Sequence, residues 1–219
     1  MSDMFNEVDE ELRKERMEAL WKKYGLILIT IAVLIIAVVG GSQFWINYQA
    51  GKSAASGDKF VEALDAEEDD DAETNSEEIY LNLVEEGYAG YPLIAKFKLA
   101  STLLAQDKIE DAEKLYAEIT QEAEQEEVKN LALIRYSYVL LEKGDISAVK
   151  DQLAAMSGVW SGIGKEVIAM DYLKKDEKNI AVNLFDEIAR DINSSDAVRQ
   201  RADKAIAVLS SEGILPTSE

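Results

Sequence analysis

The sequence contains neither cysteine nor histidine. Disulfides, thiolate nucleophiles and the usual zinc and haem ligands are therefore excluded, and the commonest general base at neutral pH is missing. The remaining candidate acids, Asp171, Glu166 and Glu187, have no partner base or nucleophile and lie at helical spacing, as residues of a solvated helix face do. We expect no enzyme activity, no cofactor, no metal site and no small-molecule substrate.

Basic residues are scarce beside acidic ones. The 219 residues include 23 Lys and Arg against 43 Asp and Glu, and the formal net charge is -20. Of these, 18 basic and 36 acidic residues follow Gly51, so this part of the chain carries about -18. Nucleic-acid binding depends on Lys and Arg that neutralise phosphates. We therefore expect no nucleic-acid partner.

Proline is scarce as well, with only Pro92 and Pro216, whereas alanine, leucine, glutamate and lysine are abundant. This composition favours helices. Apolar residues recur at helical spacing around Ile79 and in residues 91–106, 109–124, 127–143, 146–156, 163–175, 178–191 and 196–211. Turn residues separate these segments, among them Gly87, the pair Gly144-Asp145, and the group Gly158, Gly162 and Gly164. The predicted fold class is all-α.

One long apolar run lies near the N-terminus. Residues 24–51 contain no charged residue, and aromatic residues flank the run on both sides: Trp21, Tyr24, Phe44, Trp45 and Tyr48. About 20 apolar residues cross a bilayer, and aromatic residues gather at its interfaces. We predict a transmembrane helix at residues 24–48. A cleavable signal peptide is the alternative, because small residues follow at Ala50 and at 53–55.

The basic residues near this run predict its orientation. Five Lys and Arg precede it, whereas only Lys52 and Lys59 follow closely. Because basic residues are retained on the cytoplasmic side, we expect a cytoplasmic segment at 1–23. In a Gram-negative bacterium the protein would then be a single-pass inner-membrane protein whose remaining residues lie in the periplasm.

An acidic segment follows the span. Residues 65–78 hold nine acidic residues in fourteen and nothing apolar beyond alanine, so we predict an exposed loop within connecting helices at 49–87. A calcium site is the functional alternative. The segment lacks the spaced D-x-D-x-D-G pattern of a calcium loop, which argues against it.

The helices after this segment form repeats. Residues 99–119 align without gaps with residues 168–188, and Ala100 then matches Ala169, Ala112 matches Ala181 and Tyr116 matches Phe185. The offset of 69 residues is about two tetratricopeptide periods of 34. Residues 132–153 fit between them if their turn is one residue shorter, which places Ser137 and Ala148 at the small positions. A generic helical bundle is the alternative.

Small residues at these positions let two antiparallel helices approach closely. We therefore predict an α-solenoid of divergent tetratricopeptide-like helix pairs at residues 88–211, followed by a tail at 212–219. Such repeats line a concave groove with residues of each first helix. The predicted partner-binding residues are Ile94, Phe97, Leu104, Leu131, Ile134, Tyr138, Leu141, Ile163, Met170 and Leu173. They suit an apolar or amphipathic polypeptide, unless the chain itself fills the groove.

The order of these features resembles a known family. An opening of SDMFNEVDEELRKERMEALWKKYG, an apolar run, an aromatic exit at Phe44 and Trp45, and divergent repeats with a Gly144-Asp145 turn are similar to alphaproteobacterial members of the YfgM-type family of ancillary translocon subunits. The resemblance implies an inner-membrane anchor, a periplasmic repeat domain, association with the Sec translocon, and contacts with periplasmic chaperones or exported chains. It implies no catalytic residues. An architectural or division-coordinating scaffold, docked through its transmembrane helix, is the alternative function.

Overall fold

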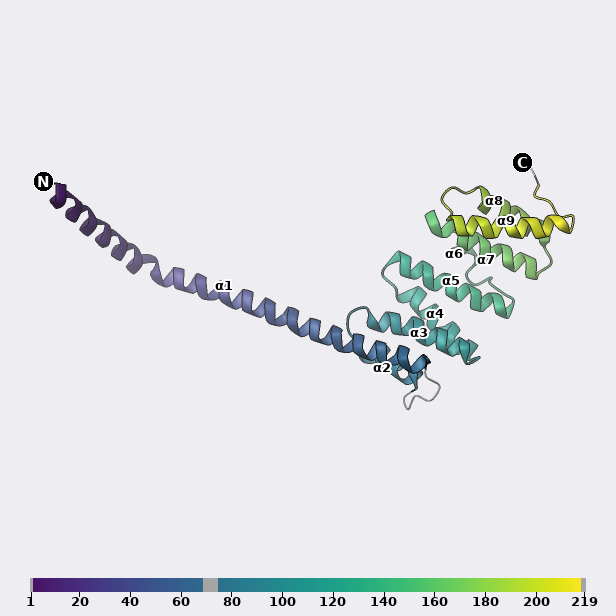
Figure 1. Ribbon diagram of the computed structural model, residues 1–219, viewed down its shortest axis with the longest axis horizontal. Coiled ribbons are helices and arrows are strands. Elements are labelled where there is room, and N and C mark those ends of the chain that lie inside the picture. The colour runs from purple at the N-terminus through teal and green to yellow at the C-terminus, as the bar shows by residue number, and fades with distance from the viewer. Residues whose placement is uncertain (1, 69–74, 218–219) are drawn as a thin grey trace. The chain divides into compact units, whose positions relative to one another are not determined.

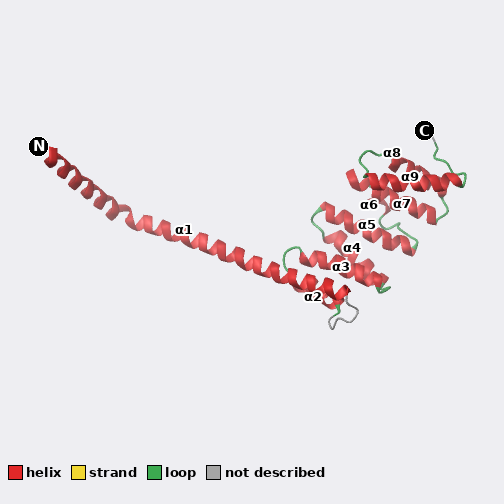
Figure 2. Cartoon of the chain, viewed as in Figure 1, coloured by secondary structure: helices red, strands yellow, loops and turns green. Residues whose placement is uncertain are grey.

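The computed structural model describes residues 2–68 and 75–217, and every regular element in these residues is helical (Figures 1 and 2). The all-α prediction is therefore confirmed. The elements, in chain order, are α1 (Ser2–Glu68), α2 (Ser76–Glu86), α3 (Tyr91–Ala105), α4 (Ile109–Glu122), α5 (Glu126–Lys143), α6 (Lys150–Ala154), the short 3-10 helix η1 (Gly158–Trp160), α7 (Ser161–Lys174), α8 (Lys178–Arg190) and α9 (Asp196–Ser211).

The chain divides into two units, Met1–Ala55 and Ser56–Glu219. In the first unit, the apolar side chains of the run after Tyr24 are exposed, and an 18-residue window has a mean hydropathy of 2.6 with 6% of it buried. By length and composition this helix is able to cross a membrane, and its exposure argues against a buried core helix. A signal sequence would share these properties.

The predicted acidic loop at 65–78 is wrong at both ends. Helix α1 continues through Glu68, and α2 begins at Ser76, where the Asn75 side chain accepts a hydrogen bond from the Glu77 backbone N–H. One acidic residue at the end of α1 has partners in α3: Glu67 accepts hydrogen bonds from Lys98 at 2.5 Å and from Thr102 at 3.0 Å. Composition alone did not reveal these cross-helix partners. Residues 69–74 lie outside the described residues.

The second unit is a series of helix pairs. Ala100, Ala112, Ala169 and Ala181 are each fully buried, and Tyr116 and Phe185 are nearly so. The matched positions of the two aligned segments therefore occupy matching places in the core. This agreement is what the close approach of antiparallel helices requires, and it confirms the solenoid of tetratricopeptide-like pairs.

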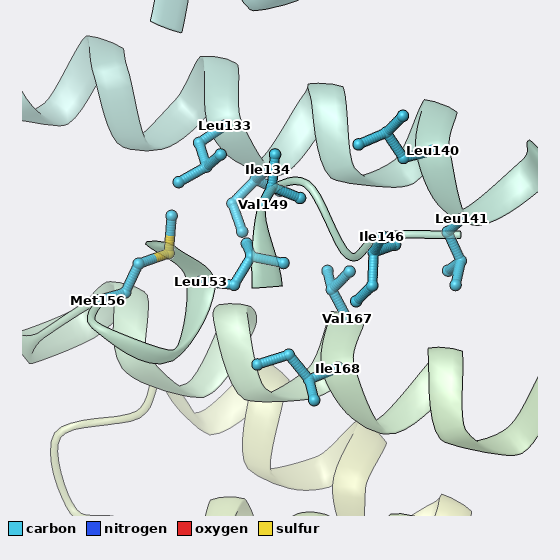
Figure 3. Close-up of a cluster of buried hydrophobic side chains, with 10 residues drawn as sticks. All are labelled: Leu133, Ile134, Leu140, Leu141, Ile146, Val149, Leu153, Met156, Val167 and Ile168. Carbon is cyan, nitrogen blue, oxygen red and sulfur yellow. The ribbon is translucent and has the colours of Figure 1, made fainter. Parts of the chain in front are cut away.

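The middle repeat differs from the prediction. Ala148 is exposed, whereas Val149, Leu153 and Ile146 are buried. The turn is not one residue shorter, because Val149 follows Ala112 by the same 37 residues that separate Ser137 from Ala100. The second helix of this repeat is also short: α6 covers Lys150–Ala154 instead of residues 146–156. Figure 3 shows this segment packed between side chains of α5 and α7.

Glycines at the start of α7 serve packing and not a turn. Gly162 and Gly164 are buried within the helix, contrary to the prediction. A Cβ atom on Gly164 would lie 2.5 Å from the Leu153 carbonyl oxygen, and one on Gly162 would lie 2.2 Å from Ser194 Oγ. Only glycine permits these approaches.

The end of α1 belongs to the same architecture. Ala63 is fully buried against α2 and α3, and it precedes Ala100 by 37 residues. The positions of Ala63, Ala100, Ser137 and Ala169 are thus equivalent, and all four are fully buried. Residues that the sequence analysis assigned to connecting helices, at the end of α1 and in α2, therefore form an additional pair.

The turns that follow α3, α5 and α7 share one geometry. Asp107, Gly144 and Asp176 have φ angles of 62°, 88° and 61°, and Gly213 after α9 has a φ of 83°. In each case the next residue donates its backbone N–H to a carbonyl five residues earlier, as Asp145 does to Leu140 at 3.1 Å. This left-handed C-terminal cap satisfies helix carbonyls and reverses the chain.

Candidate protein-binding groove

The predicted groove residues of α3 and α5 are only partly accessible. Ile94 and Leu104 on α3, and Leu131 and Tyr138 on α5, are 36–48% exposed. Phe97 is half-buried, and its ring lies 6.2 Å from that of Tyr116. These five residues remain candidates for partner binding.

Two other predicted residues of α5 belong to the core. Ile134 and Leu141 are each 6% exposed and belong to a buried cluster that also includes Ile146, Val149 and Leu153 and, from α7, Val167 and Ile168 (Figure 3). Helical spacing identified the apolar face of α5 but did not show which part of it the next repeat covers.

The predicted residues of α7 are half-buried. Ile163 and Leu173 pack against the cluster that includes Val198 and Leu209 of α9, and Met170 packs against the cluster around α5. In this part of the unit the chain itself covers the apolar face. The self-filled alternative therefore holds for α7, while the α3 and α5 portion stays open.

A pocket of about 410 Å³ marks the open portion; we call it the groove pocket. It is lined by Ser101, Leu104, Asp107, Ile109, Tyr116, Arg135, Tyr138, Val139 and Glu142. Helices α3 and α5 supply its walls, and α4 supplies Ile109 and Tyr116. Its volume falls within the usual range of ligand pockets.

Charged residues border this pocket, and sequence analysis missed them. Arg135 and Glu142 lie one helical turn from Tyr138 on the same face of α5, a spacing that was visible in the sequence. Burial, and then the negative charge of Glu166, raise the pKa of the Tyr138 hydroxyl, so the phenol stays neutral and is able to donate a hydrogen bond.

Glu166, one of the candidate acids in the sequence analysis, is held by an ion pair. Its carboxylate is 2% exposed and accepts two hydrogen bonds from Arg201 of α9, at 2.7 Å from Nε and 2.6 Å from Nη2. The pair fixes α9 on α7. Among the described residues no cluster of His, Cys, Asp and Glu has the arrangement of a metal site.

Comparison with known families agrees with this architecture. Residues 18–181 match the tetratricopeptide repeat-like domain family. The match covers most of the chain, so the chain belongs to this family, whose domains are typically interaction modules and not catalysts. No curated protein and no solved structure matches the chain.

Proposed function

We propose that this protein is a membrane-anchored interaction module that holds an apolar or amphipathic polypeptide segment in the groove between α3 and α5. The observation that carries the proposal is the groove pocket, in which Leu104 and Tyr138 remain exposed beside Arg135 although neighbouring apolar residues are buried. Exposed apolar side chains that gather in a concave site are typical of a binding surface.

The resemblance to YfgM-type subunits supports a more specific function. We propose that the anchor is residues 24–48, that the repeats lie in the periplasm, and that the protein assists exported or membrane proteins beside the Sec translocon, with periplasmic chaperones as further partners. The exposed apolar surface of the first unit supports the anchor, and the excess of Lys and Arg before it supports the orientation.

Site-specific photocrosslinking in cells tests the groove. A photoreactive amino acid at Tyr138 should yield adducts with polypeptides, and Leu104→Glu should reduce them, because a buried charge disfavours an apolar segment. Val208 on α9 is 61% exposed and outside the groove, so it is the control position. Equal adducts at Tyr138 and Val208, or adducts insensitive to Leu104→Glu, would refute groove binding. Adducts confined to residues 26–48 would favour the scaffold alternative.

Cysteine labelling tests the orientation. Because the chain has no cysteine, single cysteines at Ser2 and Ser218 report on each end separately. In cells with a permeabilised outer membrane, an impermeant reagent should label Ser218→Cys and spare Ser2→Cys. The reverse pattern would place the repeats in the cytoplasm.

A further inference from the structure

A second pocket lies away from the groove, where successive helix pairs meet. It has a volume of about 450 Å³ and is lined by Val84, Pro92, Leu93, Lys96, Ile119, Glu122, Ala123, Glu124, Gln125 and Val128. We call it the edge pocket. It shares no lining residue with the groove pocket. Its walls come from the last turns of α2 and α4 and the first turns of α3 and α5.

The wall of the edge pocket is mostly apolar. Ile119 is 1% exposed, and Val84, Pro92, Leu93 and Val128 are half-buried. A volume of about 450 Å³ leaves room for more than one side chain. Water in contact with these apolar groups is released when a side chain of similar character enters, so apolar side chains are favoured.

The rim of the edge pocket is acidic. Among the described residues that line it, Lys96 is the only cation, and its Nζ lies 2.9 Å from Glu122 and 3.2 Å from Glu118. Burial opposes the charge of Lys96, but its hydrogen bonds to the two carboxylates outweigh burial and raise its pKa. Two carboxylates share the single positive charge of Lys96, so a net negative charge remains beside it, and the side chains of Glu122 and Glu124 are exposed.

Two acidic side chains at this edge of the repeats, Glu86 and Glu122, occupy unfavourable places. Helix C-termini carry a partial negative charge, and basic residues stabilise them. The last turns of α2 and α4 contain no basic residue, and they end in Glu86 and Glu122. A positively charged ligand would relieve this repulsion, whereas an anionic one would increase it.

From this combination we infer that the edge pocket binds a basic amphipathic segment of a partner polypeptide, with apolar side chains in the pocket and Lys or Arg at Glu122 and Glu124. This binding site is independent of the groove, and it favours partners of opposite charge to the acidic body of the chain. An anionic membrane surface fits poorly, because the rim repels it.

The probe is an 18-residue peptide of leucine and lysine at helical spacing; a leucine and glutamate peptide and a serine and lysine peptide serve as comparisons. The protein is the full chain in nanodiscs of zwitterionic lipid. Because the chain has no cysteine, Gln125→Cys carries an environment-sensitive dye that reports occupancy at the pocket and not binding to lipid. Only the leucine and lysine peptide should shift the emission with saturation.

Two sets of variants test the acidic rim and the apolar interior of the edge pocket separately. The double variant Glu122→Gln with Glu124→Gln should raise the Kd about three- to tenfold, as expected for two partly exposed charges. The control Asp151→Asn with Asp203→Asn removes the same charge at exposed sites outside the pocket and should leave the Kd unchanged. Ala123→Leu, or Val128→Phe if the first disturbs the turn, fills the pocket and should raise the Kd at least about tenfold, with unchanged helical content by circular dichroism.

Three results would overturn the inference: an equal effect of the control pair, unchanged affinity after the pocket is filled, or equal binding of the glutamate or serine peptide. Tyr138→Glu in the groove pocket should not alter the probe's affinity. If Tyr138→Glu weakened the binding of the probe, the probe would be assigned to the groove pocket instead. The experiment therefore distinguishes failure of this inference from failure of the proposed function.

Discussion

Leucine substitutions at three alanines test whether burial or sequence spacing decides their role. Ala112 and Ala181 are fully buried between helices, whereas Ala148, which the sequence alignment placed at the same repeat position, is exposed. Leucine adds three carbon atoms. If a cavity were present, their burial would stabilise the fold by about 0.8 kcal/mol for each carbon. Protein cores are close-packed, however, so the added atoms force side chains and backbone to shift.

We therefore expect Ala112→Leu and Ala181→Leu to lower the free energy of unfolding by about 1–3 kcal/mol each, and Ala148→Leu to change it by less than about 0.5 kcal/mol. Urea denaturation of residues 50–219, followed by circular dichroism, measures the difference, and we expect this fragment to be soluble and helical. In thermal melts each 1 kcal/mol corresponds to about 2–4 °C. Equal small effects at all three positions would refute the close helix joint, and a large effect at Ala148 would refute its exposed position.

Three further predictions follow from local geometry. Asp107→Gly should stabilise the repeats and Gly144→Ala should destabilise them, each by about 0.5–1 kcal/mol in urea denaturation, because only glycine adopts a positive φ without steric cost; effects of the opposite sign would contradict the shared turn geometry. The single variant Arg201→Leu leaves the buried carboxylate of Glu166 unpaired, whereas the double variant Arg201→Leu with Glu166→Gln does not. In thermal melts the single variant should therefore be less stable than the double variant by about 1–3 kcal/mol. Additive losses would show that the two residues are uncoupled. The Asp191 carboxylate accepts a hydrogen bond from the Asn193 backbone N–H, which lowers the pKa of Asp191 in the folded protein below the ordinary value of 3.8. The stabilisation from this carboxylate is therefore present above pH 3.8 and is lost as the pH falls through the pKa of the folded protein. An NMR titration midpoint at or above 3.8 would contradict this.

Features that depend on neighbours along the chain were predictable. The apolar run before Gly51 is long enough to cross a bilayer because hydropathy and length alone decide this property. The helices follow from apolar residues at a period of 3.6, and the bounds of α9 were predicted to the residue, although Ser195 and not Asp196 is its N-cap. The equivalence of Ala100 and Ala169 was visible as well, since a repeated joint repeats its small residues.

Positions that depend on contacts distant in sequence were not predictable. Ala148 and Val149 are adjacent, and only the packing of the segment between α5 and α7 decided that valine is buried. Ile134 and Leu141 share a helical face with Tyr138, but the cluster that they form with residues 146–156 and α7 buries them and leaves the tyrosine accessible.

The same limit applies to glycines, charges and pockets. Gly164 suggested a turn in the sequence, yet its role is to admit the Leu153 carbonyl beside α7. From the sequence, Glu67 was predicted to lie in a solvated loop. The fold instead places beside it Lys98 and Thr102, which are 31 and 35 residues away in the sequence. Sequence by itself determined the membrane-length helix, the helical class and the repeat, because each arises from a local period. The tertiary structure alone decided which apolar residues remain open to a partner, because that depends on which neighbouring helix covers them.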